Sequence, residues 1–220
     1  MKVHCLFEQS GTFKNEFKKI GIEAYDYDIL NDYNETDKII NIFDEIEKAY
    51  KKEKNIFNKI KKNDLIIAFF PCTRFSNQAY MLFQCKAKQL KNLSDIDKIS
   101  KVIKYHNELS LLYDMICKLC YICLERELKL IIENPYSQEH YLTRYFPIKP
   151  KIIDMDRTRR GDYYVKPTQY WFINCEPKCN FVIEPLIYNE KKLICKISNK
   201  VERSIISKDY ARRFIKGFIL

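Results

Sequence analysis

An apolar run ends in a proline and a cysteine in Asp64-Leu65-Ile66-Ile67-Ala68-Phe69-Phe70-Pro71-Cys72-Thr73. The run is typical of a buried strand, and Pro71 stops it because proline has no N–H to donate to a neighbouring strand. A second apolar run, Leu128-Lys129-Leu130-Ile131-Ile132, ends in Glu133-Asn134-Pro135. Because open α/β sheets bind ligands at the carboxyl ends of their strands, we expect the Cys72 thiol and the Glu133 carboxyl to share one site.

The segments on either side of these runs alternate between strand and helix patterns. We predict strands at 3–7 and 22–29, and helices at 11–20, 38–51, 56–60 and, as two pieces broken near 92–95, within 77–127. This alternation predicts an α/β fold with a doubly wound, mostly parallel sheet. Beyond Pro147 the pattern changes, and we predict a small strand-rich appendage at about 160–200 and a closing helix at 207–216. Its strands are expected at 170–174, 181–183 and 193–197, all within a single domain over residues 1–220.

The composition is that of a folded protein with one core. Of the 220 residues, 46% are hydrophobic and 31% are charged, which excludes a disordered chain. No apolar stretch approaches the roughly 18 to 20 residues that span a bilayer, and the first residues do not resemble a secretory signal. We therefore expect a cytoplasmic protein with no membrane partner.

The net charge of +10 favours a polyanionic partner such as nucleic acid. The alternative is that the many lysines only form a solvated coat, as in proteins of AT-rich genomes. The nine cysteines are expected to be free thiols. Cys117, Cys120 and Cys123 lie in an apolar helical pattern with no fourth ligand at a suitable spacing, so we expect core packing and no metal site.

The first strand, turn and helix resemble the place where doubly wound folds bind a nucleotide. The turn contains Gly11, which would let a ligand approach the backbone, although dinucleotide-binding turns carry three glycines. Asp28 follows the second predicted strand, where a carboxylate can hold ribose hydroxyls. Together these residues predict a site for an adenosine-containing ligand.

Several motifs, taken in order, resemble the DNA cytosine-5 methyltransferases, and in particular small phage-type members. The motifs are Phe7-x-x-x-Gly11-x-Phe13, Asp28, Pro71-Cys72, Glu133-Asn134-Pro135, Gly161 to Trp171 with its Lys166-Pro167-Thr168, and Arg203 to Phe214. The resemblance spans nearly the whole chain. It implies a Rossmann-like class I methyltransferase fold, S-adenosylmethionine as the cofactor and DNA as the partner.

The resemblance also implies roles for individual residues. Cys72 would be the nucleophile that attacks cytosine C6, Glu133 the acid at N3 of the base, and Arg159 the arginine that orients the base. The target base would have to be flipped out of a duplex or presented single-stranded. Substrate-binding roles fall to Arg74, Asn134, Lys166 and Thr168. Cofactor-binding roles fall to Phe7, Glu8, Ser10, Gly11, Thr12, Phe13, Asp28 and Pro71.

Two departures from the family pattern leave alternatives open. Glu8, Gln9 and Ser10 stand where the family has small residues, and residues 174–202 are too few for a target-recognition region. The protein would then methylate DNA with little sequence preference, or take its specificity from a partner protein, or act on RNA or a free nucleotide. A non-catalytic nucleic-acid-binding or regulatory protein on the same scaffold is the alternative from another functional class.

Overall fold

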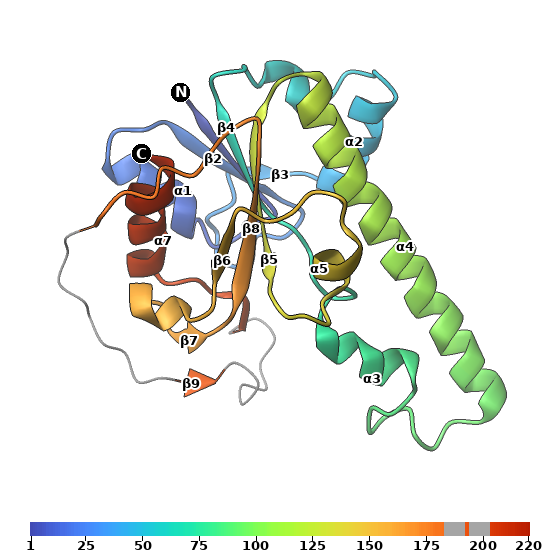
Figure 1. Cartoon of the computed structure of the whole chain (residues 1–220). Helices are drawn as coiled ribbons and strands as arrows, with labels where there is room; N and C mark the ends of the chain where they lie inside the picture. The colour runs from blue at the N-terminus through green and yellow to red at the C-terminus, as the bar shows by residue number, and fades with distance from the viewer. Residues whose placement is uncertain (183–191, 194–202) are drawn as a thin grey trace.

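The chain forms an α/β fold around a mixed, mostly parallel sheet (Figure 1). The computed structural model describes residues 1–182, 192–193 and 203–220. In this part of the chain the seven-stranded sheet has the order β3-β2-β1-β4-β5-β8-β6, and within it β8 runs against the other strands. Its strands are β1 (Val3–Leu6), β2 (Ala24–Asp28), β3 (Lys38–Ile39), β4 (Leu65–Phe69), β5 (Lys129–Pro135), β6 (Ile152–Asp154) and β8 (Thr168–Ile173). A separate pair consists of β7 (Tyr164–Val165) and β9 (Lys192–Leu193).

Helices cover both faces of the sheet (Figure 1). Side chains alternate along a strand, so Ile66 and Ala68 of β4 face one core and Leu65 and Ile67 face the other. The helices are α1 (Thr12–Lys19), α2 (Ile42–Tyr50), α3 (Tyr80–Phe83), α4 (Asp95–Glu125), α5 (Tyr141–Tyr145) and α7 (Lys208–Phe214). Short 3-10 turns occur at η1 (Ile56–Lys59), η2 (Asn77–Ala79) and η3 (Arg157–Arg160), and a π-helical turn, η5 (Ile215–Ile219), follows α7. Helices α2 and α4 pack on one face and α1 and α7 on the other, which explains why β4 is apolar at every position.

The predicted α/β class and the mostly parallel sheet are confirmed, but one predicted helix is wrong at its start. Lys38 and Ile39, predicted to be helical, form β3 and pair with the end of β2. Helix α2 begins only at Ile42, because the Asn41 side chain accepts the N–H of Phe43 at 3.1 Å and caps the helix there.

The predicted strand at 170–174 joins the main sheet instead of a separate appendage. As β8 it lies between β5 and β6, and every residue of it is buried because it is packed on both faces. Residues 181 and 182 are not in a strand, which corrects the prediction for 181–183, and residue 183 lies outside the described residues. Of the predicted strand at 193–197, Leu193 is in β9 and the rest lies outside the described residues.

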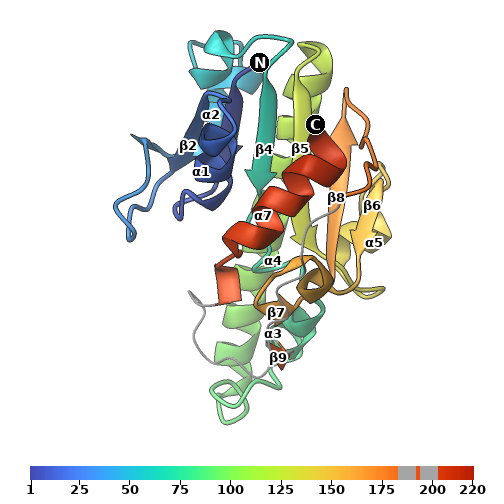
Figure 2. The same cartoon turned by 90° about the vertical axis from the view of Figure 1, so that its left-hand side faces the viewer.

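A helical arm, residues 77–108, extends beyond the carboxyl edge of the parallel strands. It comprises η2, α3 and the first half of the long helix α4 (Figures 1 and 2). Helix α4 starts where Ser94 accepts the N–H of Asp97 at 3.2 Å, which confirms the predicted break near 92–95. Among the described residues, no helix combines the length and the apolar character needed to cross a membrane.

Candidate active site

Most of the predicted site residues lie at or just beyond the carboxyl ends of β1, β2, β4 and β5. Strands β1 and β4 are neighbours, with β2 and β3 on one side and β5 on the other, so the strand order reverses between them. This reversal is where doubly wound sheets open a crevice for ligands. Phe69, the last residue of β4, is the register partner of Glu133, and Cys72 follows in the turn after it, so the two predicted catalytic residues lie at the same edge of adjacent strands.

Glu133 is buried and faces two cations. Its Oε1 lies 3.5 Å from Nη1 of Arg157 and 3.9 Å from Nζ of Lys166. The residue is 5% exposed, and among the described residues no group donates a hydrogen bond to this oxygen. Buried polar atoms are almost always hydrogen-bonded in folded proteins, so an unused carboxylate oxygen at a strand end is an open position for a donor on a ligand.

A tight turn fixes Cys72 beside this carboxylate. Its carbonyl oxygen accepts the N–H groups of Phe75 at 3.0 Å and of Ser76 at 3.3 Å. Burial raises the pKa of the Cys72 thiol, and the charge of Glu133 raises it further, whereas the cations Lys166 and Arg203 lower it. The net effect is an increase, so the Cys72 thiol is protonated at neutral pH.

Asn134 and Thr168 shape the loops around the site. The Asn134 amide donates to the carbonyl of Phe70 at 2.8 Å and thereby ties the end of β5 to the end of β4. Its Oδ1 is buried and accepts no hydrogen bond from the described residues. Thr168 is fully buried, and its hydroxyl donates to the carbonyl of Lys166 at 2.9 Å. Thr168 therefore positions the loop that carries Lys166.

The arginine beside Glu133 is Arg157, not the expected Arg159. Arg157 is fully buried, its Nη2 lies 2.5 Å from the Asp162 carboxylate, and its guanidinium lies over the Tyr210 ring at 4.4 Å. Burial opposes its charge, but Asp162 more than compensates and raises the pKa of Arg157 above its ordinary range.

Arg159, in contrast, has a side chain that is 79% exposed and lies 3.7 Å from Asp156. It lines a hollow of about 410 Å³ together with Arg160 and Phe218, and Glu133 is not among the residues that line this hollow. The sequence carries three arginines in four residues here, and no local pattern shows which one is buried.

The predicted cofactor turn is organised by Glu8. Its carboxylate accepts the N–H of Phe13 at 2.7 Å and of Lys14 at 3.4 Å, so it occupies the N-terminus of α1. Burial raises the pKa of Glu8 to about 7, even though these two hydrogen bonds lower it. Ser10 and Thr12 pair through their hydroxyls at 3.0 Å.

Gly11 is favoured by the backbone conformation of this turn. Its φ is +64°, and a Cβ there would lie 2.9 Å from a carboxylate oxygen of Glu35. A side chain would therefore be strained as well as crowded at this turn.

The aromatic residues of this turn have different environments. Phe7, at φ +60°, places its ring centroid 5.2 Å from Phe70 and 5.5 Å from Phe43, directly at the end of β1. Phe13 is 1% exposed and packs on Phe69 at 4.8 Å, so it belongs to the core.

Asp28 ends β2 and has one oxygen in a local hydrogen bond. Its Oδ1 accepts the N–H of Leu30 at 2.9 Å, and burial raises its pKa. The next residue, Ile29, is 60% exposed and presents an apolar side chain beside the carboxylate.

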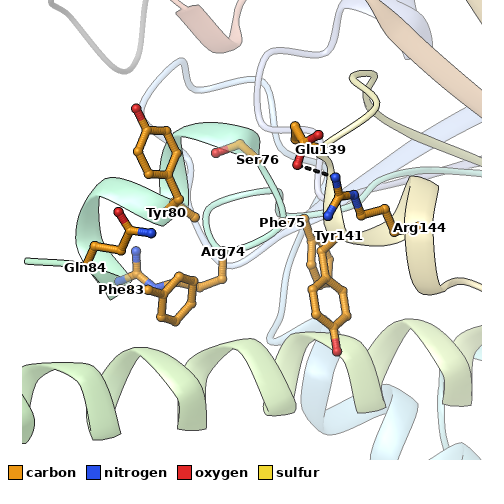
Figure 3. A pocket seen from close by; sticks show the side chains of 10 residues that line it. Arg74, Phe75, Ser76, Tyr80, Phe83, Gln84, Glu139, Tyr141 and Arg144 are labelled. Carbon is orange, nitrogen blue, oxygen red and sulfur yellow. Dashed lines mark ion pairs between the residues drawn. The ribbon is translucent and has the colours of Figure 1, made fainter.

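The Arg74 side chain contacts helix α4 of the helical arm. Its Nε donates to Glu108 of α4 at 2.6 Å, and its guanidinium lies 4.7 Å from the Tyr105 ring centroid. The structure therefore gives Arg74 the role of tying the Cys72 turn to α4. Arg74 also lines another hollow, of about 450 Å³, which we call the first hollow. It lies between residues 74–84 and 139–144 (Figure 3).

The cysteines of α4 pack as expected from their helical pattern. Cys120 and Cys123 are buried in the core, and burial raises the pKa of Cys120 to about 12. Among the described residues, no three histidine, cysteine or acidic side chains are grouped as metal ligands.

Comparison with known proteins adds no family to this picture. No protein-family model matches the chain, and no curated protein matches it significantly.

Proposed function

We propose that this protein is an S-adenosylmethionine-dependent methyltransferase that acts on cytosine C5 in DNA through a covalent adduct with Cys72. The observation that carries the proposal is the pairing of a cysteine with a buried carboxylate at the ends of neighbouring strands, where Glu133 Oε1 has no hydrogen-bond donor among the described residues. The strand order, with β8 reversed beside β5, is compatible with the class I methyltransferase fold that the sequence resemblance implies.

The chemistry requires both groups. Cytosine C5 is a poor nucleophile, and attack of the Cys72 thiolate on C6 would make it an enamine carbon that accepts a methyl group. Glu133 would hold a proton at N3 of the base, and Lys166 and Arg157 would keep the carboxylate oriented. Loss of the C5 proton and of the C6–sulfur bond then restores the aromatic ring and frees Cys72. A base in a duplex must leave the stack to reach these groups.

The residues at the ends of β1 and β2 fit an adenosine. The Phe7 ring and the exposed Ile29 offer apolar surfaces, and Asp28 offers a carboxylate oxygen for ribose hydroxyls. Glu8 already accepts the free N–H groups of α1, so it suits an ammonium group and not a carboxylate at the amino-acid end. When bound there, S-adenosylmethionine would supply an electrophilic methyl group.

Glu8 is also the observation that favours a second candidate, a non-catalytic nucleic-acid-binding protein on this scaffold. Its carboxylate fills the helix N-terminus that doubly wound proteins use for anionic groups. Nucleic-acid binding without S-adenosylmethionine binding in calorimetry would favour this candidate.

The test of the enzyme is a trapped adduct. The protein is incubated with S-adenosylmethionine and an oligonucleotide that contains 5-fluorocytosine, which blocks the final proton loss and leaves a covalent product on a denaturing gel. We expect an adduct with the natural protein, none with Cys72→Ser, and an undiminished one with the control Cys179→Ser, which alters an exposed free cysteine. Retained adduct in Cys72→Ser, or no adduct in the natural protein, would refute the proposal.

A further inference from the structure

The first hollow adjoins the turn that follows Cys72. The turn that fixes Cys72 also sets Phe75 and Ser76 in one wall, through hydrogen bonds from their N–H groups to the Cys72 carbonyl. The opposite wall is attached to it, because the N–H of Tyr141 donates to the Phe75 carbonyl at 2.9 Å. At about 450 Å³ it has room for a nucleobase.

The walls of the hollow carry an aromatic ring that the fold does not use. Tyr141 stacks on Phe75 at 6.1 Å, and Phe83 lies 4.8 Å from His106. Tyr80 is 53% exposed, and among the described residues no aromatic ring packs on it. Figure 3 shows it on one side of the hollow, with the Glu139–Arg144 ion pair on the other. Exposed rings of this kind are the stacking platforms of proteins that bind unpaired bases.

Cationic side chains continue from the hollow along the helical arm. Lys86, Lys88 and Lys91 follow α3 and are exposed, and none of them has an ion-pair partner within the part of the chain that the structure describes. Arg144 is paired with Glu139, but both side chains are exposed, and such pairs are weak enough for a phosphate to displace.

We propose that this hollow binds an unpaired base next to the target cytosine, stacked on Tyr80, and that the helical arm binds the adjoining phosphates. The assignment of the base as a neighbour of the target rests on the proposed function. The binding of single-stranded nucleic acid does not, because it depends only on the ring, the cavity and the lysines. The aromatic wall selects for an unpaired base, so the protein binds a single strand more tightly than the matching duplex.

The test measures fluorescence anisotropy of a labelled single-stranded oligonucleotide with one cytosine, without cofactor. We expect Tyr80→Ala to weaken binding on the order of tenfold, as for loss of one stacked base. Tyr121→Ala is the matched control, because Tyr121 is 50% exposed but lies toward the other end of α4. An oligonucleotide that lacks the base on one side of the cytosine should bind the natural protein more weakly than the complete oligonucleotide does. Tyr80→Ala should not weaken the binding of this oligonucleotide further.

The lysines are tested by the salt dependence of binding. Lys86→Gln/Lys88→Gln should reduce the slope of log affinity against log salt by about 1.4, since each phosphate contact on a single strand contributes about 0.7. The control Lys51→Gln/Lys54→Gln removes the same charge from exposed lysines after α2. Its binding should depend more steeply on salt than that of the arm variant.

The proposal is overturned if Tyr80→Ala and the arm lysine pair bind like their controls, or if duplex binds more tightly than single strand. This failure is distinct from failure of the proposed function. The latter appears as absent S-adenosylmethionine binding and absent adduct in the natural protein, whatever the arm variants do.

Discussion

Replacing Glu8 with glutamine should make the protein more stable at alkaline pH, and the structure gives the size of the effect. Glu8 is buried at the start of α1, where burial raises its pKa from an ordinary 4.5 to about 7. Between these values the folded chain keeps a proton that the unfolded chain releases. The stabilisation is therefore fully present below pH 4.5 and is lost as the pH rises through 7.

The magnitude follows from this difference in pKa. One pKa unit corresponds to about 1.4 kcal/mol. Integrated between pH 5 and pH 8, ionisation of Glu8 costs the folded protein about 2.5 kcal/mol relative to the unfolded chain. Glutamine stays neutral, and its side-chain oxygen can still accept the N–H of Phe13.

The assay is urea unfolding of the natural protein and Glu8→Gln at both pH values. The difference in unfolding free energy, variant minus natural protein, should rise by about 2 to 3 kcal/mol from pH 5 to pH 8. Glu16→Gln is the control, because it removes another buried carboxylate of α1, one that is paired with Lys19 at 2.5 Å. A pH-independent difference for Glu8→Gln, or an equal rise for Glu16→Gln, would show that Glu8 is not held in the neutral form by burial.

Three further predictions concern the site. The rate of adduct formation should rise with pH until the Cys72 thiol ionises. Because Lys166 lowers the pKa of Cys72, Lys166→Gln should move this rise to higher pH. The rates of the natural protein and of Lys166→Gln are measured by stopping reactions at set times over a series of pH values. Arg157→Ala should cost about 3 to 5 kcal/mol of unfolding free energy, since it leaves Asp162 buried without its cation and Glu133 with Lys166 alone. A loss below about 1 kcal/mol would contradict the pairing. Asp28→Ala should weaken S-adenosylmethionine binding in calorimetry by about 1 to 3 kcal/mol, and unchanged affinity would place the ribose carboxylate elsewhere.

The sequence predicts the parts of the site that depend on local pattern and topology. The apolar runs of β4 and β5 are long enough to identify, and a parallel sheet brings their carboxyl ends to the same edge. These two facts are enough to predict that Cys72, Glu133 and Asn134 lie at one edge of the sheet. The amide bond of Asn134 to Phe70 shows how closely the two strand ends meet.

Other parts depend on residues that are distant in sequence, and here prediction fails. In the sequence Arg74 looks like a free cation beside Cys72, but its partner Glu108 lies 34 residues further along the chain, in α4. Arg157 is buried instead of Arg159 because Asp162 and Tyr210 enclose it, and Tyr210 arrives from the last helix. No window of neighbouring residues contains that information.

Burial and the charges around Glu133 together favour the thiol form of Cys72, the proposed nucleophile. Arg157 and Lys166 face Glu133, and Arg157 also faces Asp162, so two cations already balance two carboxylates in a buried space. A thiolate at Cys72 would add a third negative charge without a third buried cation, which agrees with the raised pKa of Cys72. If a proton taken up with the base were shared between the Glu133 carboxylate and N3, it would offset one carboxylate charge and leave Lys166 to offset the thiolate. The same substrate contact that activates the ring would then also favour ionisation of the attacking sulfur, so the reactive form arises only when a base is in place.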